Sequence, residues 1–385
     1  MPCLQLLATM QVGKLCRLAL RFWMGLTLVL GCFCHYYCPT RRRLVYSRLL
    51  QIFNWVIMIV NLGMYYFYFI YATNYFAKGT FRRQTFVIQL CNCSVNLQLL
   101  IIIVQSIWRL LREQEVCQAY NELSEILEED LQLKEHSRFY SLAFLAKIHN
   151  FIHNFNFALS VLMIWGLRPF EVSDLLANFF YVYNSLARDS FQVAYILVLL
   201  NVSEALRQNR QQEPGNYLQF MRKLRRHEQL MEIGRRVHRK FAWLVAVVLF
   251  YQVYFNTATI YLGYSFFVQR EEPLGLCGWN LKILLTVMSI SVKLFDALLL
   301  QIICENLLTE ENQICRSPKL QRQDVNSKAV HRQWEMSALR RAIRRASSEN
   351  KVLGMFRMDM RCAFALISCS VSYGVIIIQI GYIRG

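Results

Sequence analysis

Hydrophobic residues in this chain gather into seven long blocks that polar segments separate. Six blocks are almost wholly apolar over the roughly 20 residues that a helix needs to cross a hydrocarbon layer about 30 Å thick. The block at residues 139–167 is long enough, but its first half carries Lys147, His149 and Asn150. Prolines fall outside the blocks, so no helix is interrupted. We therefore predict an all-α polytopic membrane protein with seven spans, at residues 49–72, 86–108, 139–167, 175–202, 241–268, 276–304 and 362–383.

A shorter apolar stretch at residues 22–34 precedes the basic run Arg41, Arg42 and Arg43. Its 13 residues are few for a span. A signal peptide is one alternative, but the small-residue cleavage pattern is missing, and an extra span is another. We favour an interfacial or re-entrant helix on the cytoplasmic side.

Lysine and arginine are divided unevenly between the two sides of the predicted spans. Thirty lie before Leu49 or within residues 109–138, 207–240 and 316–345, and six lie on the other side. The positive-inside rule then places the N-terminus in the cytoplasm and the C-terminus outside. The net charge of +18 mostly reflects this asymmetry, so it indicates contact with anionic membrane lipid rather than with nucleic acid.

The inner connections are long and charged, whereas the outer ones are short. Residues 109–138 form an acidic amphipathic pattern with Glu122 and Glu125, and residues 220–240 and 338–346 are basic. We expect these segments to pair in a helical cytoplasmic platform; separate solvated faces near anionic lipid are the alternative. The predicted organisation is an N-terminal cytoplasmic region with the interfacial helix at 1–48, spans one to six at 49–304 with inner loops at 109–138 and 203–240, a cytoplasmic segment at 305–351 and the seventh span at 352–385.

Sequence signatures of enzymes are absent. The chain has no phosphate-binding glycine loop, zinc-protease histidine pair or nucleophile elbow. The cysteine pairs Cys32/Cys34 and Cys91/Cys93 lack a second ligand pair at zinc spacing. We expect no catalysis, no metal site and no cofactor. The matched broken spans of many secondary transporters are not visible either, which favours a receptor or channel.

Charged residues inside the spans are candidate sites because they are costly in lipid. Arg188 and Asp189 are adjacent in the fourth span, and Lys293 and Asp296 lie three apart in the sixth, where an ion pair within one helix is easy. Structural pairing is the simplest interpretation of both. A polar stripe on the third span favours bonds between helices over a metal site, and it comprises His149, His153, Asn156 and Ser160.

The outer halves of the spans are rich in aromatic and amide side chains, which suits a small amphipathic ligand entering from outside. Interfacial aromatic belts are the alternative explanation. The ligand-binding candidates are Tyr65, Trp165, Tyr181, Tyr254, Asn256, Tyr261 and Trp279, with Tyr68, Tyr183 and Asn280 at similar depth.

The most specific motif lies at the end of the chain. Gly354 and Phe356 precede a span that reads Ser372-Tyr373, five apolar or small residues, and Gln379-Ile380. This motif resembles the insect gustatory receptor family, whose last span carries Thr-Tyr, five mostly apolar residues and Gln-Phe after a Gly-x-Phe lead-in. Ser372 keeps the hydroxyl group of the family's threonine. Ile380 replaces an aromatic ring, which leaves a gate role at that position open.

The resemblance implies a tastant-gated, non-selective cation channel in the plasma membrane of chemosensory neuron dendrites. It implies four identical or related subunits, an anchor at residues 305–351 that joins them, and a tastant pocket in each outer bundle. Residues 338–346 would belong to a cytoplasmic first half of the seventh helix, within this anchor. The pore would be lined by the seventh span, with Ser372, Ile376, Gln379 and Ile380 as pore or gate residues.

Helical geometry points to the same surface independently of the resemblance. Ser372 and Gln379 are seven residues, or almost two turns, apart, so they share a face that Ser368 and Ala365 continue. A glutamine that only satisfies a neighbouring helix is the alternative for Gln379. Alternative functions are an insect odorant receptor-like channel, a transporter and a G-protein-coupled receptor; the last would place the N-terminus outside, and its Asp-Arg-Tyr and Asn-Pro-x-x-Tyr signatures are absent.

Overall fold

The computed structural model describes residues 2–38, 40–41, 43–78, 85–130, 137–165, 172–212, 217–268, 279–313, 351–352 and 356–384. Within these ranges the chain is almost entirely helical. The helices are α1 (Pro2–Val29), α2 (Arg48–Lys78), α3 (Thr85–Glu125), α4 (Arg138–Trp165), α5 (Val172–Gln211), α6 (Tyr217–Val268), α7 (Trp279–Gln313) and α10 (Met360–Arg384), and a π-helical turn, Ile126–Asp130, follows α3. The short strands are β1 (His35–Cys38), β2 (Arg43–Tyr46), β3 (Lys351–Val352) and β4 (Phe356–Arg357).

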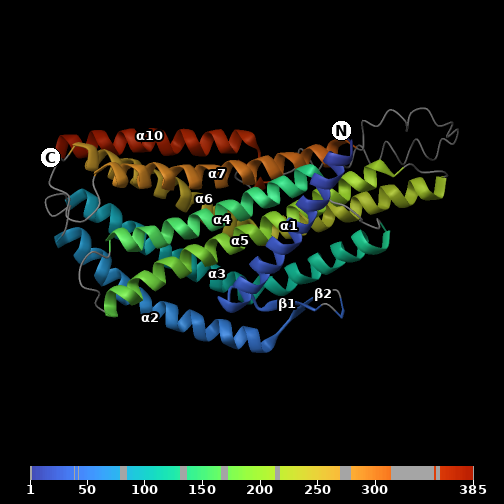
Figure 1. Ribbon diagram of the computed structural model, residues 1–385, viewed down its shortest axis with the longest axis horizontal. Helices are drawn as coiled ribbons and strands as arrows, with labels where there is room; N and C mark the ends of the chain where they lie inside the picture. Colours follow the sequence, from blue (N-terminus) through green and yellow to red (C-terminus); the bar gives the residue numbers. More distant parts are fainter. Residues whose placement is uncertain are drawn as a thin grey trace.

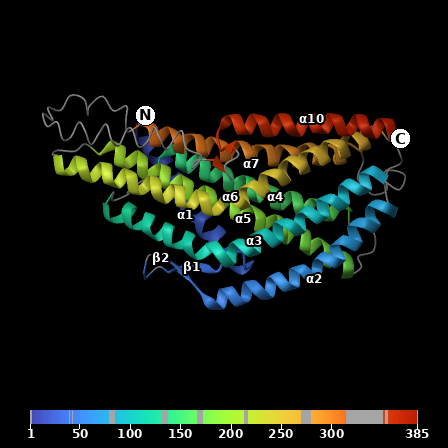
Figure 2. The same ribbon diagram turned by 180° about the vertical axis from the view of Figure 1, so that it is seen from behind.

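The helices α2 to α7 and α10 run along one long axis and alternate in direction (Figure 1). Both views place α10 along one edge of the bundle, beside α6 and α7, and α2 along the opposite edge (Figures 1 and 2). Each of these helices covers most or all of one of the seven apolar blocks, and several extend well beyond it. The predicted all-α bundle is therefore confirmed.

The number of membrane spans follows from length and hydropathy. Among the described residues, α2, α5, α6, α7 and α10 are long and apolar enough to cross a membrane. A sixth span results if the two parts of α3, Asn92–Arg109 and Leu111–Glu128, count as one despite the 57° bend between them. The described part of the chain thus has five or six candidate membrane spans, while the seventh span, α4, and the orientation stay predictions.

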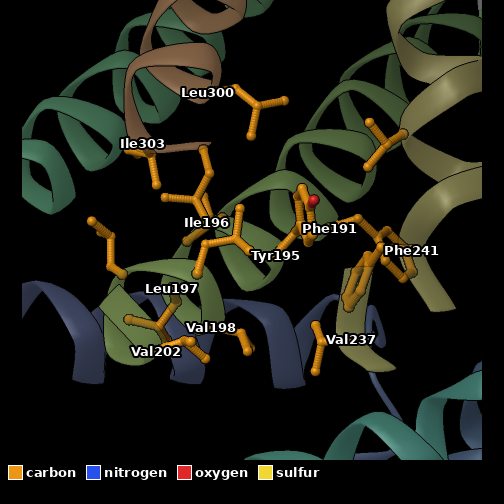
Figure 3. Close-up of a cluster of buried hydrophobic side chains, with 14 of the residues drawn as sticks. Phe191, Tyr195, Ile196, Leu197, Val198, Val202, Val237, Phe241, Leu300 and Ile303 are labelled. Carbon is orange, nitrogen blue, oxygen red and sulfur yellow. The ribbon is translucent and has the colours of Figure 1, made fainter. Parts of the chain in front are cut away.

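The core of the bundle is organised around α5. Between residues 183 and 206 almost every side chain of this helix is buried, because α2, α3, α4, α6 and α7 pack around it. Figure 3 shows Phe191, Tyr195 and Ile196 of α5 packed against Phe241 of α6 and Ile303 of α7. The rings of Tyr195 and Phe241 lie 5.0 Å apart. A helix enclosed in this way must satisfy its polar residues inside the bundle.

The helices at the two edges leave apolar side chains uncovered. On α2, Leu49 is 79% exposed and Ile59 is 64% exposed. On α10, Phe364 is 65% exposed and Tyr373 is 55% exposed. Apolar faces of this kind suit lipid or another membrane subunit.

The N-terminal region differs from the sequence prediction. Residues 22–34 do not form one apolar helix, because α1 begins at Pro2 and ends at Val29. The chain then turns at Gly31, whose φ of 59° favours glycine, and a Cβ there would lie 2.6 Å from Ile57. After this turn, strands β1 (35–38) and β2 (43–46) pair antiparallel and form a hairpin. The prediction missed this turn because a run of apolar residues carries no information about backbone conformation.

The hairpin is fixed to α3. The backbone N–H of Cys34 donates to Glu113 Oε1 over 2.5 Å, and His35 Nδ1 lies 2.6 Å from the same oxygen. The side-chain amide of Asn121 exchanges hydrogen bonds of 2.8 and 2.9 Å with the backbone of Leu44. On the other side, Cys16 of α1 donates to a backbone carbonyl of α4. The N-terminal region therefore packs on the bundle.

The end of α3 and the start of α6 pack side by side, and residues 109–130 with residues 217–240 are here termed the α3–α6 platform. Arg236 pairs with Glu122, and Lys240 pairs with Glu115. Hydrogen bonding to Lys240 lowers the pKa of the Glu115 carboxyl, and hydrogen bonding to Glu122 raises the pKa of Arg236. The predicted pairing of the acidic loop helix with residues 220–240 is confirmed. The other basic segment, residues 338–346, lies outside the described residues.

Candidate functional site

A network of buried charges joins α4, α5 and α7 near the middle of these helices. Lys147 of α4 pairs with Asp296 of α7, and it also donates to Gln192 Oε1 of α5 over 3.0 Å. Asn150 donates to the same Asp296 oxygen over 2.9 Å. The predicted ion pair within α7 between Lys293 and Asp296 is therefore wrong, since α4 supplies the partners of Asp296 in the described structure. A contact between helices was invisible to a sequence argument based on spacing within one helix.

Asn154 connects the second half of the network. Its Oδ1 accepts a hydrogen bond of 2.8 Å from Lys293 Nζ, and its Nδ2 donates to Asp189. Arg188 lies beside Asp189, with Nε 3.5 Å from Oδ1, and its guanidinium carbon lies 4.9 Å from the centre of the Tyr251 ring. The predicted proximity of Arg188 and Asp189 is confirmed. The three helices α4, α5 and α7 thus share one buried polar layer. Its hydrogen bonds and ion pairs are strengthened by the apolar surroundings.

The polar stripe of α4 that enters this network is not the predicted one. Lys147, Asn150 and Asn154 are buried, whereas His149 is exposed and stacks with His153 at 6.2 Å between ring centres. Spacings of three and four residues place the buried three on one face. That spacing is present in the sequence, but spacing alone does not distinguish the face that meets Asp189 and Asp296 from the neighbouring histidine face.

A cavity of about 20 Å³ lies against the network, and the hollow around it, open side included, measures about 440 Å³. The smaller volume holds about one water molecule. Two buried amides of α3 face this region without full pairing: Gln98 Oε1 and Gln105 Nε2 have no partner in the described structure. The lining residues are Gln98, Ile101, Ile102, Gln105, Asn154, Tyr181, Asn184, Ser185, Arg188, Tyr251, Phe255 and Lys293.

Tyr181 is the ligand-binding candidate that lines this cavity. It stacks on Tyr68, whose ring lies 4.9 Å from that of Phe180, and Tyr65 lies 5.9 Å from Phe180. The structure therefore brings Tyr65 and Tyr181 into one aromatic cluster between α2 and α5. The chemistry available there is aromatic stacking beside a polar cavity.

Other candidates serve contacts between helices. The Tyr65 hydroxyl donates to Asn96 Oδ1 over 2.8 Å, and the Tyr254 hydroxyl donates to the Leu90 carbonyl over 2.7 Å. Asn256 is buried, and its Oδ1 has no partner in the described part of the chain. The side chains of Trp165 and Trp279 lie outside the described residues.

Tyr261 joins α6 to α10. Its buried ring meets Phe86 edge-on at 5.4 Å and packs with Ile377 and Ile378. A Cβ added at Gly381 would lie 2.7 Å from Tyr261 Cε2, so the two helices approach closely at this glycine. Tyr261 therefore forms a tight packing contact between α6 and α10.

The predicted pore residues lie together on one face of α10. Ser372, Ile376, Gln379 and Ile380 are all exposed in the single chain, and so are Ala365 and Ser368. The opposite face packs on α6, where Gly374 would place a Cβ 3.0 Å from Ile260 Cγ2. The helix begins after Asp359, whose Oδ1 accepts a hydrogen bond of 3.1 Å from the Cys362 backbone.

The rest of the sequence motif is only partly described. Phe356 lies in β4 opposite Val352 of β3, and Gly354 lies outside the described residues. Across the described residues, no three His, Cys, Asp or Glu side chains are grouped as metal ligands.

Comparisons with known proteins agree with the motif. A family model described as 7tm chemosensory receptor matches residues 20–383. The chain is 66% identical over 377 residues to a Drosophila melanogaster protein named "Putative gustatory receptor 10b", covering 98% of this chain and all of that one.

Two structures of the insect olfactory receptor OR5 from Machilis hrabei share the fold. One aligns with a TM-score of 0.63 at 13% identity, and the other, in complex with eugenol, with a TM-score of 0.55 at 12% identity. Both alignments cover 94% of this chain and 98% of the receptor. The predicted resemblance to gustatory receptors is confirmed, and the chain belongs to the 7tm chemosensory receptor family.

Proposed function

We propose that this chain is a gustatory receptor that works as a tastant-gated cation channel, with α10 of four subunits surrounding a central pore. The observation that carries the proposal is the uncovered face of α10, on which Ser372, Ile376 and Gln379 lie exposed while the opposite face is packed against α6. An apolar membrane helix with a line of polar side chains on its free face suits a subunit contact or a water-filled pore.

The polar positions on that face fit a pore better than a lipid contact. Gln379 and Ser372 present an amide and a hydroxyl group, which are costly in hydrocarbon but can coordinate partly hydrated cations. Ile376 and Ile380 lie between and beside them and would form an apolar collar. Closed channels often gate by such dewetted constrictions.

The proposed topology has seven spans, the N-terminus in the cytoplasm and the C-terminus outside. The asymmetric distribution of lysine and arginine supports it, as does the alternating direction of α2 to α7 and α10 (Figure 1). The α3–α6 platform would then lie in the cytoplasm, with residues 305–351 joining the subunits. The site of action would be the plasma membrane of chemosensory neuron dendrites.

The proposed ligand is a small molecule that binds between α3, α5 and α6, where Tyr181 lines the cavity. Binding would favour one position of α6 over another, and the contact of Tyr261 with Gly381 would transmit this movement to α10. A related olfactory receptor of the same fold has been captured with eugenol, which supports a small-molecule ligand.

Recording from cells that express the chain, alone and with related receptors, tests the proposal against a broad tastant panel. Ligand-evoked unitary currents with several permeant cations are expected. Saturable, slow flux without unitary steps would instead identify a transporter. A strict need for one dedicated co-receptor would favour the second candidate, an odorant receptor-like channel, which the OR5 fold match brings into consideration.

A further inference from the structure

The buried network carries an excess of positive charge. In the described structure its ionisable members are the cations Lys147, Arg188 and Lys293 and the carboxylates Asp189 and Asp296. All five side chains are nine-tenths or more buried. With each group in its ordinary ionised form, one cation is left without a counter-charge. A buried unbalanced charge is costly, so an anion in this layer would be bound strongly.

The excess charge can be located. Lys147 is committed to Asp296, and Arg188 lies beside Asp189. Lys293 hydrogen-bonds to Asn154 Oδ1, and Asn154 Nδ2 in turn donates to Asp189, so Arg188 and Lys293 share the single carboxylate of Asp189. Both Lys293 and Arg188 line the cavity, so the positive potential is directed into open space.

The cavity offers further hydrogen-bond donors. Gln105 is 3% exposed, and its Nε2 is buried without a partner in the described structure, on the α3 side of the same cavity. An unpaired buried N–H group costs free energy that an accepting ligand would restore. Two cations and an unsatisfied amide donor thus surround a volume large enough for one small polar group.

The remaining walls are apolar and aromatic, with Ile101, Ile102 and Phe255 beside Tyr181. Such walls suit a hydrocarbon tail rather than a bare inorganic ion, and the open side of the hollow leaves room for that tail. We propose that this cavity binds a small organic carboxylate, with the carboxylate between Arg188 and Lys293 and its apolar part toward Phe255. The inference rests on the proposed function in taking this carboxylate to be the tastant.

The test measures the melting temperature of the purified full-length receptor in HEPES buffer at fixed ionic strength. Sodium pentanoate should raise it by about 2–5 °C at a hundredfold excess over Kd. Neutral pentanamide and sodium chloride should not. Equal shifts of the melting temperature with chloride and pentanoate would show only a general anion site. No shift with pentanoate would show no site. Either result would overturn the proposal.

Two variants of the same cluster provide matched controls. Lys293→Met keeps an unbranched side chain that is one atom shorter and removes the excess charge, so it should raise the melting temperature without ligand and abolish the pentanoate shift. Lys147→Met should lower the melting temperature, because Asp296 loses its cation. A Lys293→Met receptor that keeps the wild-type pentanoate shift would place the carboxylate elsewhere and overturn the assignment.

The outcome is separable from that of the channel proposal, since melting needs no current. A receptor that pentanoate stabilises but that passes no current would refute the channel and keep the carboxylate site. Tastant-evoked currents without a pentanoate shift of the melting temperature would support the channel and refute the carboxylate site.

Discussion

The ring of Tyr261 on α6 lies directly against the Cα of Gly381 on α10, so closely that a Cβ at residue 381 would overlap its hydroxyl group. Phe86 packs edge-on against the same ring and keeps it from moving aside. We therefore predict that Gly381→Ala separates the outer ends of α6 and α10 and shifts the concentration–response curve of the channel at least several-fold. Whole-cell recording at matched surface expression measures this.

A second substitution controls for this effect. In the double variant Gly381→Ala with Tyr261→Leu, the ring that the new methyl group would meet is absent. Its shift of the concentration–response curve should therefore be smaller than the sum of the shifts in the two single variants. Additive effects of the two substitutions would show that the contact does not couple the helices.

The pair of Lys147 and Asp296 gives a stability prediction. Asp296→Ala leaves the Lys147 ammonium buried without its carboxylate, and it should destabilise the receptor by about 3–5 kcal/mol. Lys147→Met combined with Asp296→Leu removes both charges and should recover most of that loss. Thermal melting of the detergent-solubilised receptor measures both, and a double variant no more stable than Asp296→Ala would contradict the pairing.

Gln379 provides the test of the pore. If its amide lines the narrowest part, Gln379→Ala and Gln379→Glu should change the relative permeabilities of sodium, potassium and calcium, because the substitutions alter the ring of polar groups around the ions. Cys369 is exposed on α10 almost three turns before Gln379 and about 80° away from it around the helix axis, and it supplies the control variant Cys369→Ala. Permeability ratios equal to wild type in both Gln379 variants would remove this residue from the pore.

Orientation can be tested with inserted epitopes. An epitope at the N-terminus should stain only permeabilised cells, whereas an epitope after Pro273, between α6 and α7, should stain intact cells. An epitope at Glu125 of the α3–α6 platform should behave like the N-terminal one. Staining of the N-terminus in intact cells would support the topology of a G-protein-coupled receptor and reject the proposed one.

Hydrophobic blocks were enough to predict which residues form the long helices. The block at residues 362–383 became α10 (Met360–Arg384), because a run of this length has no competing way to satisfy its backbone in lipid. The same reasoning could not predict that α1 ends at Val29, since this end depends on a positive φ at Gly31 and on its close approach to Ile57. Local apolar content does not encode such a turn.

The same distinction between local pattern and long-range packing applies to the candidate site residues. The free face of α10 was predictable because helical periodicity alone places Ser372 and Gln379 together. The partners of Asp296 were not, because Lys147 lies 149 residues away in the sequence and only the packing of α4 against α7 brings them together. Tyr254 likewise proved to serve a bond to α3, which no aromatic pattern reveals.

That separation of Lys147 from Asp296 also has a consequence for synthesis. Translation produces α4 long before α7. When Lys147 leaves the ribosome, its partner Asp296, 149 residues further along the chain, has not yet been synthesised. A lysine at the centre of a lone helix costs about 2.5–3.5 kcal/mol to insert into the bilayer. We expect α4 to stay beside the insertion machinery, or to be shielded by a membrane chaperone, until α7 arrives, which makes α7 the step that commits the nascent receptor to its mature form.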